Sequence, residues 1–318
     1  MLAAQGTPSS VMATPTATEA APSRLSVSLR GARVREAAWG YGFAVLPLAV
    51  FGLFFIYPLG YAVYISFFHW GILGKTAPGR GTFNYAKVLH DPIFHTALKN
   101  IAEYTVAVVP LEMALGLSLA LVINQKIRGR NFFRSSYYFP SIASSVAITT
   151  ILLYIFSLNG LFNHLFGFNK DWFGDASTIG WGIVGMNAWT TSGTVMIFYL
   201  AALQAIPDDV YEAAALDNTG AWRTFWKITF PLLKPAHFFC LVVFGIGALK
   251  LFDQPFLIAK GASGAPNYST MYPIIYIYNA AFGSYDFGLA AAAGVIYFIL
   301  IFGLTIVERV TVGRQEAA

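Results

Sequence analysis

The chain has 318 residues, of which 57% are apolar and only 11% are charged. An ordinary soluble domain carries roughly 25% charged residues, so this composition excludes a water-soluble enzyme and indicates a lipid bilayer as the main solvent. The mean hydropathy of +0.60 agrees with this interpretation. The single cysteine, Cys240, excludes an intramolecular disulfide framework, a CxxC redox pair and a cysteine-based zinc site.

Residues 1–38 form the first segment. They are rich in Ala, Ser, Thr and Pro up to about Ser28, and then basic at Arg30, Arg33 and Arg35. This composition predicts a disordered cytoplasmic tail that leads into a membrane anchor. The apolar stretch that follows starts only near residue 40 and is longer than the apolar region of a cleavable signal peptide, so the tail is expected to be retained.

Six apolar stretches along the chain are long enough to cross a hydrocarbon core of about 30 Å as helices. Residues 101–123 carry Glu103 and Glu112, and residues 236–258 carry Lys250 and Asp253. The other four stretches carry no charge; they are residues 41–68, 135–158, 179–206 and 287–307. The predicted fold class is therefore an all-α polytopic membrane protein with six transmembrane helices.

An even number of spans places both termini on the same side of the membrane. Most of the 20 Lys and Arg residues fall in the two tails and in the even-numbered loops. The positive-inside rule then predicts a multi-pass membrane protein with both termini in the cytoplasm, including a short C-terminal tail at residues 311–318. The net charge of +5 is explained by this topology, and no nucleic-acid partner is expected.

Catalytic motifs do not occur in the sequence. The five histidines form no HxxxH or HExxH arrangement, and no GxSxG turn is present. The segment from Gly71 to Thr76 has two residues between its glycines, where a phosphate-binding loop needs four. We therefore expect no catalytic residue, no metal site and no cofactor in this chain, and any nucleotide is expected to bind another subunit.

Residues 207–235 form the most unusual loop. Asp208 and Asp209 follow Pro207 and complement the positive end of a helix, which the alanines after them extend. Residues 217–220 are expected to break this helix, because Asn218 and Gly220 accept left-handed backbone. A second short helix is expected to end before Pro231. The pattern predicts a helix-turn-helix on the cytoplasmic face.

Two interpretations of this loop are open on physical grounds. An amphipathic loop with Trp222, Phe225 and Trp226 fits the lipid interface, where tryptophan is favoured. A docking element for a cytoplasmic partner also fits, because alanines permit close approach and exposed aromatic side chains are good anchors.

The loop resembles the EAA loop of ATP-binding-cassette (ABC) importer permeases. That pattern is EAA, three residues, Gly, nine residues and then I-x-L-P. Glu212, Ala213 and Ala214 match its opening, and Ile228 and Pro231 fall at the expected spacing. Asn218 stands in the place of the glycine and Phe230 in the place of the leucine. Asn tolerates a left-handed turn and Phe stays apolar, so docking is expected to survive.

Other stretches resemble the carbohydrate-uptake group of these permeases, of maltose type or glycerol-phosphate type, and in particular the first permease of a heterodimeric pair. They lie at residues 84–85, 91–100, 133–141, 252–253 and 281–288. The resemblance covers roughly residues 41–310. It implies a first transmembrane helix with an outer loop (39–95), a five-helix type I ABC importer core (96–310) and a coupling loop (207–235).

The resemblance also implies a location, the cell membrane of a prokaryote, and a set of partners. The partners are a second homologous permease, two ABC ATPase subunits that bind ATP and Mg, an extracytoplasmic substrate-binding protein and the lipid bilayer. Carried over residue by residue, the ATPase-coupling element consists of Glu212, Ala213, Ala214, Asp217, Asn218, Gly220, Ile228 and Pro231.

The substrate route is predicted from polar residues in the spans. Acidic groups inside a membrane are costly unless they face protein or water, and sugar hydroxyls are met by aromatic rings and hydrogen-bonding groups. Lys250 and Asp253 could instead pair on one helix face, and Glu112 is expected to pair between spans. The residues expected to line the pathway are Asn100, Glu103, Asn187, Trp189, Thr190, Thr191, Asp253 and Gln254.

The predicted function is a non-catalytic permease subunit of a binding-protein-dependent ABC importer. It would form half of the pathway for an oligosaccharide, a disaccharide or a related polyol, coupled to ATP hydrolysis by a separate subunit. One alternative is a permease of the same family for glycerol-3-phosphate or glycerophosphodiesters. Alternatives of another class are a standalone ion-coupled carrier and a polytopic membrane enzyme.

Overall fold

The computed structural model describes residues 25–75, 81–125 and 128–313. The chain forms two units, residues 1–59 and residues 60–318, which are described separately. In the first unit, α1 (Leu25–Phe51) leads into a π-helical turn, η1 (Gly52–Ile56), and the helix continues as α2 (Tyr57–Ser66) into the second unit. The stretch Trp39–Ser66 is long and apolar enough to span a membrane.

Helix α1 begins before the predicted end of the N-terminal tail. Residues 25–38 are helical, so the expectation of disorder does not hold for them. These residues are mostly Leu, Ala, Arg, Val and Glu, of which Leu, Ala, Arg and Glu favour helices, and the last proline of the tail, Pro22, precedes them. The rest of the predicted tail, residues 1–24, and most of the predicted C-terminal tail lie outside the described residues.

The second unit is almost entirely helical. A two-residue antiparallel ladder, β1 (Trp70–Gly71) with β2 (Gly74–Lys75), follows α2. The remaining elements, in chain order, are α3 (Phe83–Leu89), α4 (Pro92–Asn124), α5 (Arg130–Ile142), α6 (Ser145–Ile155), α7 (Leu161–Phe166), α8 (Ala176–Gln204), α9 (Asp208–Leu216), α10 (Ala221–Thr224), η2 (Phe225–Thr229), α11 (Phe230–Leu232), α12 (Lys234–Leu249), α13 (Asp253–Ile258), α14 (Pro273–Tyr278), η3 (Asn279–Gly283) and α15 (Phe287–Gly313).

The predicted spans agree with these helices, with one correction. Four helical stretches of the described chain can cross a membrane, and the number rises to six if two bent helix pairs each count as one span. The predicted span at residues 135–158 is not straight, because α5 and α6 meet at 96°. Ala143 and Ser144 between them have extended backbone (ψ 156° and 124°), which ends one helix and starts the next.

The two longest buried helices begin at aspartate caps. The Asp91 carboxylate accepts a hydrogen bond from the Ile93 amide (2.8 Å) ahead of Pro92, and Asp175 accepts one from the Ser177 amide (2.9 Å). Such caps satisfy donors that a helix leaves unpaired at its start. The Ser177 amide, and then its hydroxyl, hold the pKa of Asp175 below its ordinary value.

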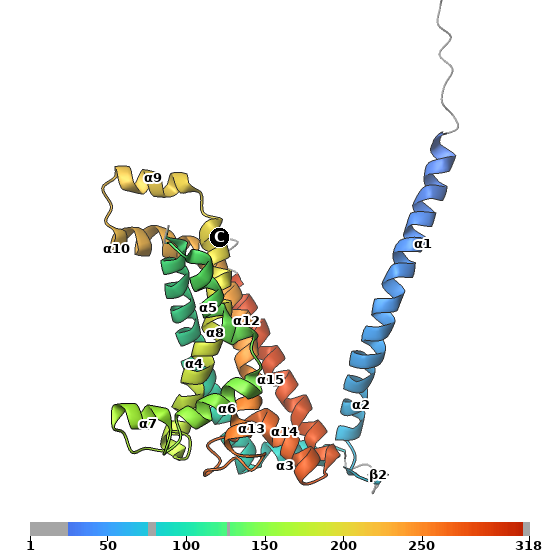
Figure 1. The fold of residues 1–318 in the computed structure, drawn as a ribbon. Helices are drawn as coiled ribbons and strands as arrows, with labels where there is room; N and C mark the ends of the chain where they lie inside the picture. Colours follow the sequence, from blue (N-terminus) through green and yellow to red (C-terminus); the bar gives the residue numbers. More distant parts are fainter. Residues whose placement is uncertain (1–24, 76–80, 126–127, 314–318) are drawn as a thin grey trace, which may run out of the picture. The chain divides into compact units, whose positions relative to one another are not determined.

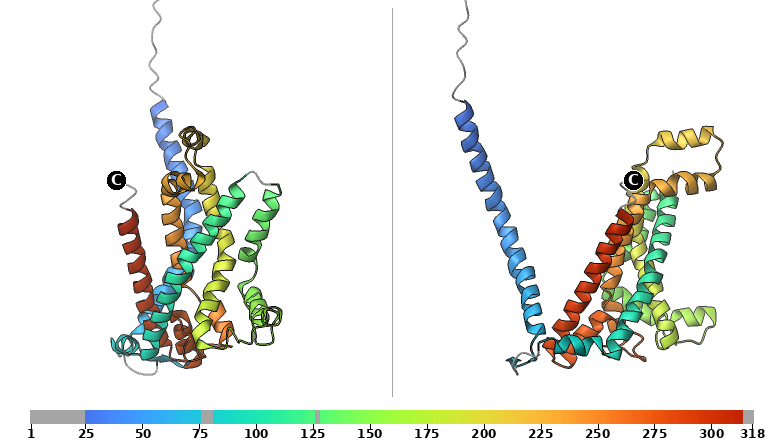
Figure 2. Two further views of the ribbon diagram at one scale, coloured as in Figure 1. Left: turned by 90° about the vertical axis from the view of Figure 1, so that its left-hand side faces the viewer. Right: turned by 180° about the vertical axis from the view of Figure 1, so that it is seen from behind.

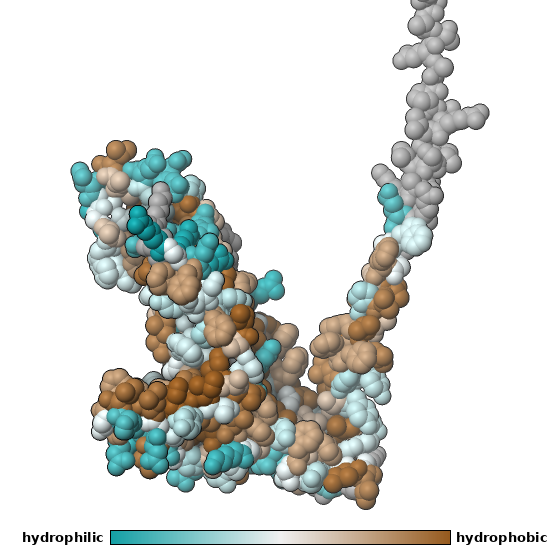
Figure 3. Space-filling view, viewed as in Figure 1, coloured by the Kyte–Doolittle hydropathy of each residue, from teal (hydrophilic) through white to brown (hydrophobic). Residues whose placement is uncertain are grey.

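The helical connections of the second unit lie at two ends. Figures 1 and 2 show α9, α10 and the end of α15 (Phe287–Gly313) at one end, and α3, α7, α13 and α14 at the other. Figure 3 shows hydrophilic residues over the α9 end and along the opposite end, with hydrophobic residues between them. This distribution is typical of a bundle that crosses a hydrocarbon layer.

Polar contacts tie distant segments together at the α3 end. The Asn84 amide donates to the carbonyls of Ser66 (2.8 Å) and Phe68 (2.9 Å), and the Tyr276 hydroxyl donates to Asp91 (2.7 Å). Burial and this bond to a carboxylate raise the pKa of Tyr276, so the phenol stays a donor. Lys87 lies 3.8 Å from Asp286. These contacts join α3 to the end of α2 and to the start of α15, and they join α14 to the start of α4.

Helices α4 and α8 share the most extensive contact in the second unit. A Cβ added at Gly116 of α4 would overlap the Val195 side chain of α8. A Cβ added at Gly193 would overlap the Tyr137 carbonyl of α5 and lie 2.9 Å from the Tyr138 Cα. Small residues at these points allow the backbones to approach closely, which is how helices associate in membranes.

We predict that Gly193→Ala destabilises the bundle by about 1–3 kcal/mol, the usual cost of overpacking, because the added methyl meets backbone atoms that have no rotamer to change. Gly185→Ala on the same helix is the control, since nothing lies within 4 Å of a Cβ there. Thermal unfolding of the detergent-purified chain measures both. Equal midpoints for the two variants would contradict the close approach at Gly193.

Candidate coupling loop and translocation pathway

The loop between α8 and α12 starts as the sequence predicts. Helix α9 follows Pro207, whose backbone is still extended (ψ 141°), and its first turn contains Asp208 and Asp209. Glu212 and Ala213 are exposed, while Ala214 is buried. Leu216 follows Glu212 by one helical turn and is 85% exposed. The exposed face of α9 therefore combines a carboxylate with an apolar side chain, and the sequence analysis did not single out Leu216.

Asn218 makes the turn that ends α9. Its φ is +50°, in the left-handed region. The Asn218 amide donates to the Ala215 carbonyl (3.1 Å), and the Thr219 amide donates to the Ala214 carbonyl (3.2 Å). These are the two bonds of a Schellman motif with Asn218 in the position that glycine usually occupies. The expectation that Asn218 accepts a left-handed turn is confirmed.

Gly220 does not have the left-handed backbone that was expected for it. Its backbone is extended (φ −66°, ψ 154°), a conformation that any residue adopts, and it precedes α10. A Cβ at this position would meet nothing within 4 Å. Gly220 therefore does not supply a left-handed backbone, because Asn218 alone among residues 217–220 has a positive φ.

The second arm of the loop runs through α10, η2 and α11. It does not end before Pro231, which lies inside α11, so that expectation is wrong. In the π-helical turn the Phe230 amide donates a hydrogen bond to the Phe225 carbonyl, five residues earlier. The next residue, Pro231, has no backbone N–H and so leaves no donor unpaired. Ile228 and Pro231 are both half-buried. The Tyr211 and Thr229 hydroxyls, 3.3 Å apart, join the two arms.

A polar region lies between α4, α6, α8, α12 and α13. It consists of two adjoining cavities of about 280 and 230 Å³. The Gln254 amide donates to the Asn187 side-chain carbonyl (3.1 Å) and to the Ser145 hydroxyl (3.3 Å). Both cavities share Ser145, Asn187, Thr191, Phe244 and Gln254.

The structure brings five of the eight predicted pathway residues to this region. Asn187, Thr191 and Gln254 line both cavities, Thr190 lines one, and Asp253 lines the other. The sequence analysis missed Ser145. A serine after the break at residues 143–144 carries no periodic signal that separates it from neighbouring serines.

Charged side chains line the larger of the two cavities. Glu112 is 4% exposed and lines this cavity together with Thr191 of α8, and its expected pairing between spans stays a prediction. Lys250 and Asp253 also line the cavity. They do not share a helix face, because α12 ends at Leu249 and α13 begins at Asp253.

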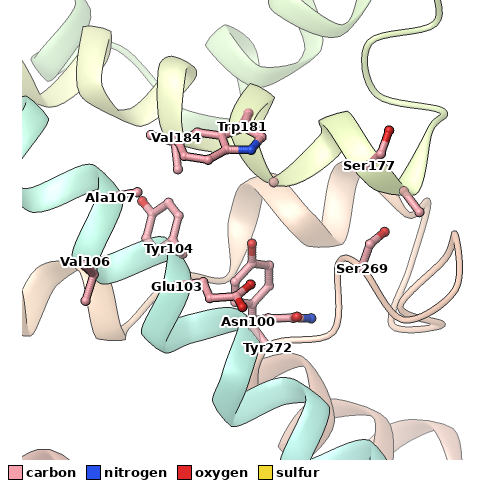
Figure 4. Close-up of a pocket in the computed structure, with 12 residues that line it drawn as sticks. Asn100, Glu103, Tyr104, Val106, Ala107, Ser177, Trp181, Val184, Ser269 and Tyr272 are labelled. Carbon is pink, nitrogen blue, oxygen red and sulfur yellow. The ribbon is translucent and has the colours of Figure 1, made fainter.

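A third cavity, of about 560 Å³, opens beside the first turns of α8. Figure 4 shows Trp181 and Val184 of α8 opposite Tyr104 and Ala107 of α4. Tyr104 lines both this cavity and the larger polar cavity, so the two adjoin.

Asn100 and Glu103 line this third cavity and not the central polar region. The Asn100 amide donates to the carbonyls of Tyr268 and Met271 (2.9 Å each), so this side chain joins α4 to the segment before α14. Glu103 lies 3.7 Å from Lys99 on the surface of α4.

Trp189 is the pathway candidate that the structure separates from the rest. It is half exposed and lines two apolar cavities, one beside α5 and one beside α6. Trp189 follows Asn187 by two residues, which is about 200° around a helix, so the two side chains cannot face the same cavity. In the described parts of the chain, no group of three or more His, Cys, Asp or Glu side chains could hold a metal ion.

Comparison with known proteins identifies the family. Residues 93–315 match the family described as "Binding-protein-dependent transport system inner membrane component". The chain belongs to this family. The match includes α4, α8 and the whole coupling loop, and the predicted membership of the ABC importer permeases is confirmed.

Two relatives of this permease are named as permease proteins of sugar transport systems. It is 31% identical over 278 residues to the lactose transport system permease protein LacF of Rhizobium radiobacter, covering 85% of this chain and 92% of LacF. It is 32% identical over 288 residues to the trehalose/maltose transport system permease protein MalF of Thermococcus litoralis, covering 89% of this chain and 96% of MalF.

The fold of this permease is that of a solved type I ABC importer. A chain of the bacterial alginate ABC transporter, crystallised with its alginate pentasaccharide-bound periplasmic protein, matches with a TM-score of 0.77 at 20% identity. The match covers 89% of this permease and 97% of that chain. The predicted all-α, multi-pass fold is confirmed, and the place of this permease in a pair stays a prediction.

We predict that Asn218→Val loosens the end of α9, because a β-branched residue in left-handed backbone costs roughly 1–2 kcal/mol. Asn218→Gly is expected to leave the turn intact. Hydrogen–deuterium exchange of the amides of residues 214–219 measures the effect. Gly220→Ala is the control, since its backbone is not strained for alanine, and equal exchange in Asn218→Val and Gly220→Ala would contradict the assignment.

Proposed function

We propose that this permease forms one half of a sugar translocation pathway and is driven by separate ABC ATPase subunits that bind ATP and Mg. The observation that carries the proposal is the polar region around Asn187, Thr191 and Gln254, which lies inside the bundle of a binding-protein-dependent permease. Amide and hydroxyl groups of this kind donate to and accept from sugar hydroxyls.

The substrate class is proposed as a disaccharide, an oligosaccharide or a related polyol. The names of the relatives LacF and MalF support a saccharide. The residues that line the larger cavity also support it, because Lys250 is the one Lys or Arg side chain among them, beside the acidic residues Glu112 and Asp253. A phosphate group is usually bound by clustered Arg and Lys side chains, so glycerol-3-phosphate and glycerophosphodiesters are not favoured.

The loop at residues 207–235 is proposed as the element that docks on the ATPase subunits. Glu212, Ala213, Asp217, Asn218 and Gly220 are exposed on it, and Trp222 is 76% exposed. Exposed aromatic side chains beside small residues make good anchors. We place this end of the bundle, together with both termini, in the cytoplasm, in line with the positive-inside rule.

The opposite end is proposed to receive substrate from an extracytoplasmic binding protein. The third cavity, near Asn100 and Glu103, lies at the start of α8 and adjoins the polar region through Tyr104. A second homologous permease would supply the other half of the pathway, with this chain as the first of the pair. A standalone carrier or a membrane enzyme would need none of these partners.

The test of this function is transport by a reconstituted complex. We expect proteoliposomes that contain this permease, a second permease and an ATPase from the same gene cluster, together with the cognate binding protein, to take up a neutral sugar with ATP inside. Glycerol-3-phosphate and glycerophosphocholine are the comparison substrates. Uptake without the ATPase, or uptake of the phosphate compounds alone, would refute the proposal.

We also predict that Glu212→Lys lowers binding-protein-stimulated ATP hydrolysis by about tenfold, because it reverses a charge on the docking face. Membrane insertion is expected to be unchanged. Glu36→Lys is the control, since it makes the same charge change at an exposed position outside the loop. Stimulated hydrolysis at the unsubstituted rate in Glu212→Lys would remove that side chain from the coupling element.

A further inference from the structure

Five rings connect the exposed tip of the coupling loop to the interior of the bundle. Their centroids are 5.7 Å apart between Trp222 and Trp226, 5.1 Å between Trp226 and Phe230, 4.5 Å between Phe230 and His237, and 5.3 Å between His237 and Tyr199. All four separations are contact distances for packed rings. We call Trp222, Trp226, Phe230, His237 and Tyr199 the ring chain.

The inner end of the ring chain is fixed by a hydrogen bond. The Tyr199 hydroxyl lies 2.8 Å from Nδ1 of His237, so α8 and α12 are joined by a directional contact at this point. Tyr199 is 1% exposed and packs beside the fully buried Cys240. The outer end is different, because Trp222 is accessible to a partner.

The connectivity of the loop explains what such a chain can do. The first arm, α9, follows α8 directly, so a force on α9 acts on α8 through the backbone. The second arm, α10 to α11, continues into α12 and has no backbone connection to α8 except through α9. The ring chain is therefore a direct side-chain route from the second arm to α8.

Helix α8 also carries the polar groups of the pathway. Thr191 and Tyr199 are eight residues apart, which is about 12 Å along the helix and within about a quarter turn of the same face. Packed protein interiors are poorly compressible, so the rings can pass a displacement from Trp222 to His237, and the hydrogen bond between His237 and Tyr199 passes it to α8. Chains of packed side chains and hydrogen bonds are one way in which distant sites are coupled.

We propose that the ring chain transmits movement of the coupling loop to α8, with His237 and Tyr199 as the positioning residues that make the connection. The proposal rests on the proposed docking role of the loop. It depends on Phe230, which replaces the leucine of the EAA pattern, because a leucine has no ring to stack on the imidazole of His237.

The test removes the Tyr199–His237 bond and keeps the rings. Tyr199→Phe and His237→Phe are each made alone and together in the complex with the second permease and the ATPase. Ser145→Cys, which lines both central cavities, reports on the pathway through its rate of labelling by a membrane-impermeant maleimide, with and without ATP and orthovanadate. The native Cys240 is fully buried and does not compete for the reagent.

The control is Phe239→Leu. Phe239 of α12 packs on Phe198 of α8 (5.1 Å between centroids), so it joins the same two helices through a ring pair that is separate from the five rings of the ring chain. Co-purification of the ATPase and the basal rate of ATP hydrolysis show whether each variant assembles.

We expect both single variants to assemble and to hydrolyse ATP at the basal rate, while the nucleotide-dependent change in labelling falls at least about fivefold, the lower end of typical coupling between sites. The double variant should lose no more than either single variant, because all three break one bond. Phe239→Leu should keep the change. Three results would overturn the proposal. The nucleotide-dependent change in labelling could stay undiminished in both single variants, or it could fall equally in Phe239→Leu. It could also fall further in the double variant than in either single variant, by the product of the two single losses. No response to nucleotide in the complex that carries Ser145→Cys alone would instead count against the proposed coupling function.

Discussion

The close approach of α4 and α8 is the contact on which the rest of the second unit depends. Burial of apolar surface does not drive two helices together inside a bilayer, because lipid tails are as apolar as the side chains. The approach rests on close packing instead, and Gly116 gives the Val195 side chain its place. Buried residues of both helices contribute to each of the two hydrophobic clusters of the unit, one toward each end.

This contact also determines where polar groups can be buried. Glu112 of α4 and Thr191 of α8 line one cavity, which also receives the segment after α12. Helix α12 ends at Leu249, whose carbonyl accepts a hydrogen bond from the Tyr297 hydroxyl of α15. That bond satisfies a carbonyl that a helix end leaves unpaired. The break lets Lys250, Asp253 and Gln254 reach the cavity from a segment that is no longer part of α12.

Much of this architecture could be predicted from the sequence because it depends on local patterns. Apolar length predicts the spans, and the acidic first turn predicts the start of α9. The left-handed turn was predicted from the tolerance of asparagine for positive φ, and Asn218 has it. The stretches that resemble the carbohydrate-uptake permeases include Asn84, Asp91 and Asp286. At the α3 end, Asn84 and Asp91 each make a tertiary hydrogen bond, and Asp286 forms an ion pair with Lys87.

The features that were not predicted depend on tertiary contacts or on small backbone changes. The 96° bend between α5 and α6 arises from two extended residues inside an apolar stretch, which hydropathy does not detect. The helix continues through Pro231 because a π-helical turn precedes it. Asn100 was taken as a pathway residue, but its amide is bound by the carbonyls of Tyr268 and Met271, far along the chain.

Helix α8 takes part in every function proposed for the chain: packing of the bundle, the translocation pathway and its coupling to the loop. It packs on α4 along its length, it carries Asn187 and Thr191 into the polar region, and its last turns hold Tyr199 against His237. A helix that is packed on several neighbours moves between discrete arrangements and does not deform continuously. Movement of the coupling loop that reaches α8 through both arms therefore shifts the polar side chains of the pathway as one body. The hydrogen bond between Tyr199 and His237 is the point at which we propose that the ring chain connects the second arm to α8.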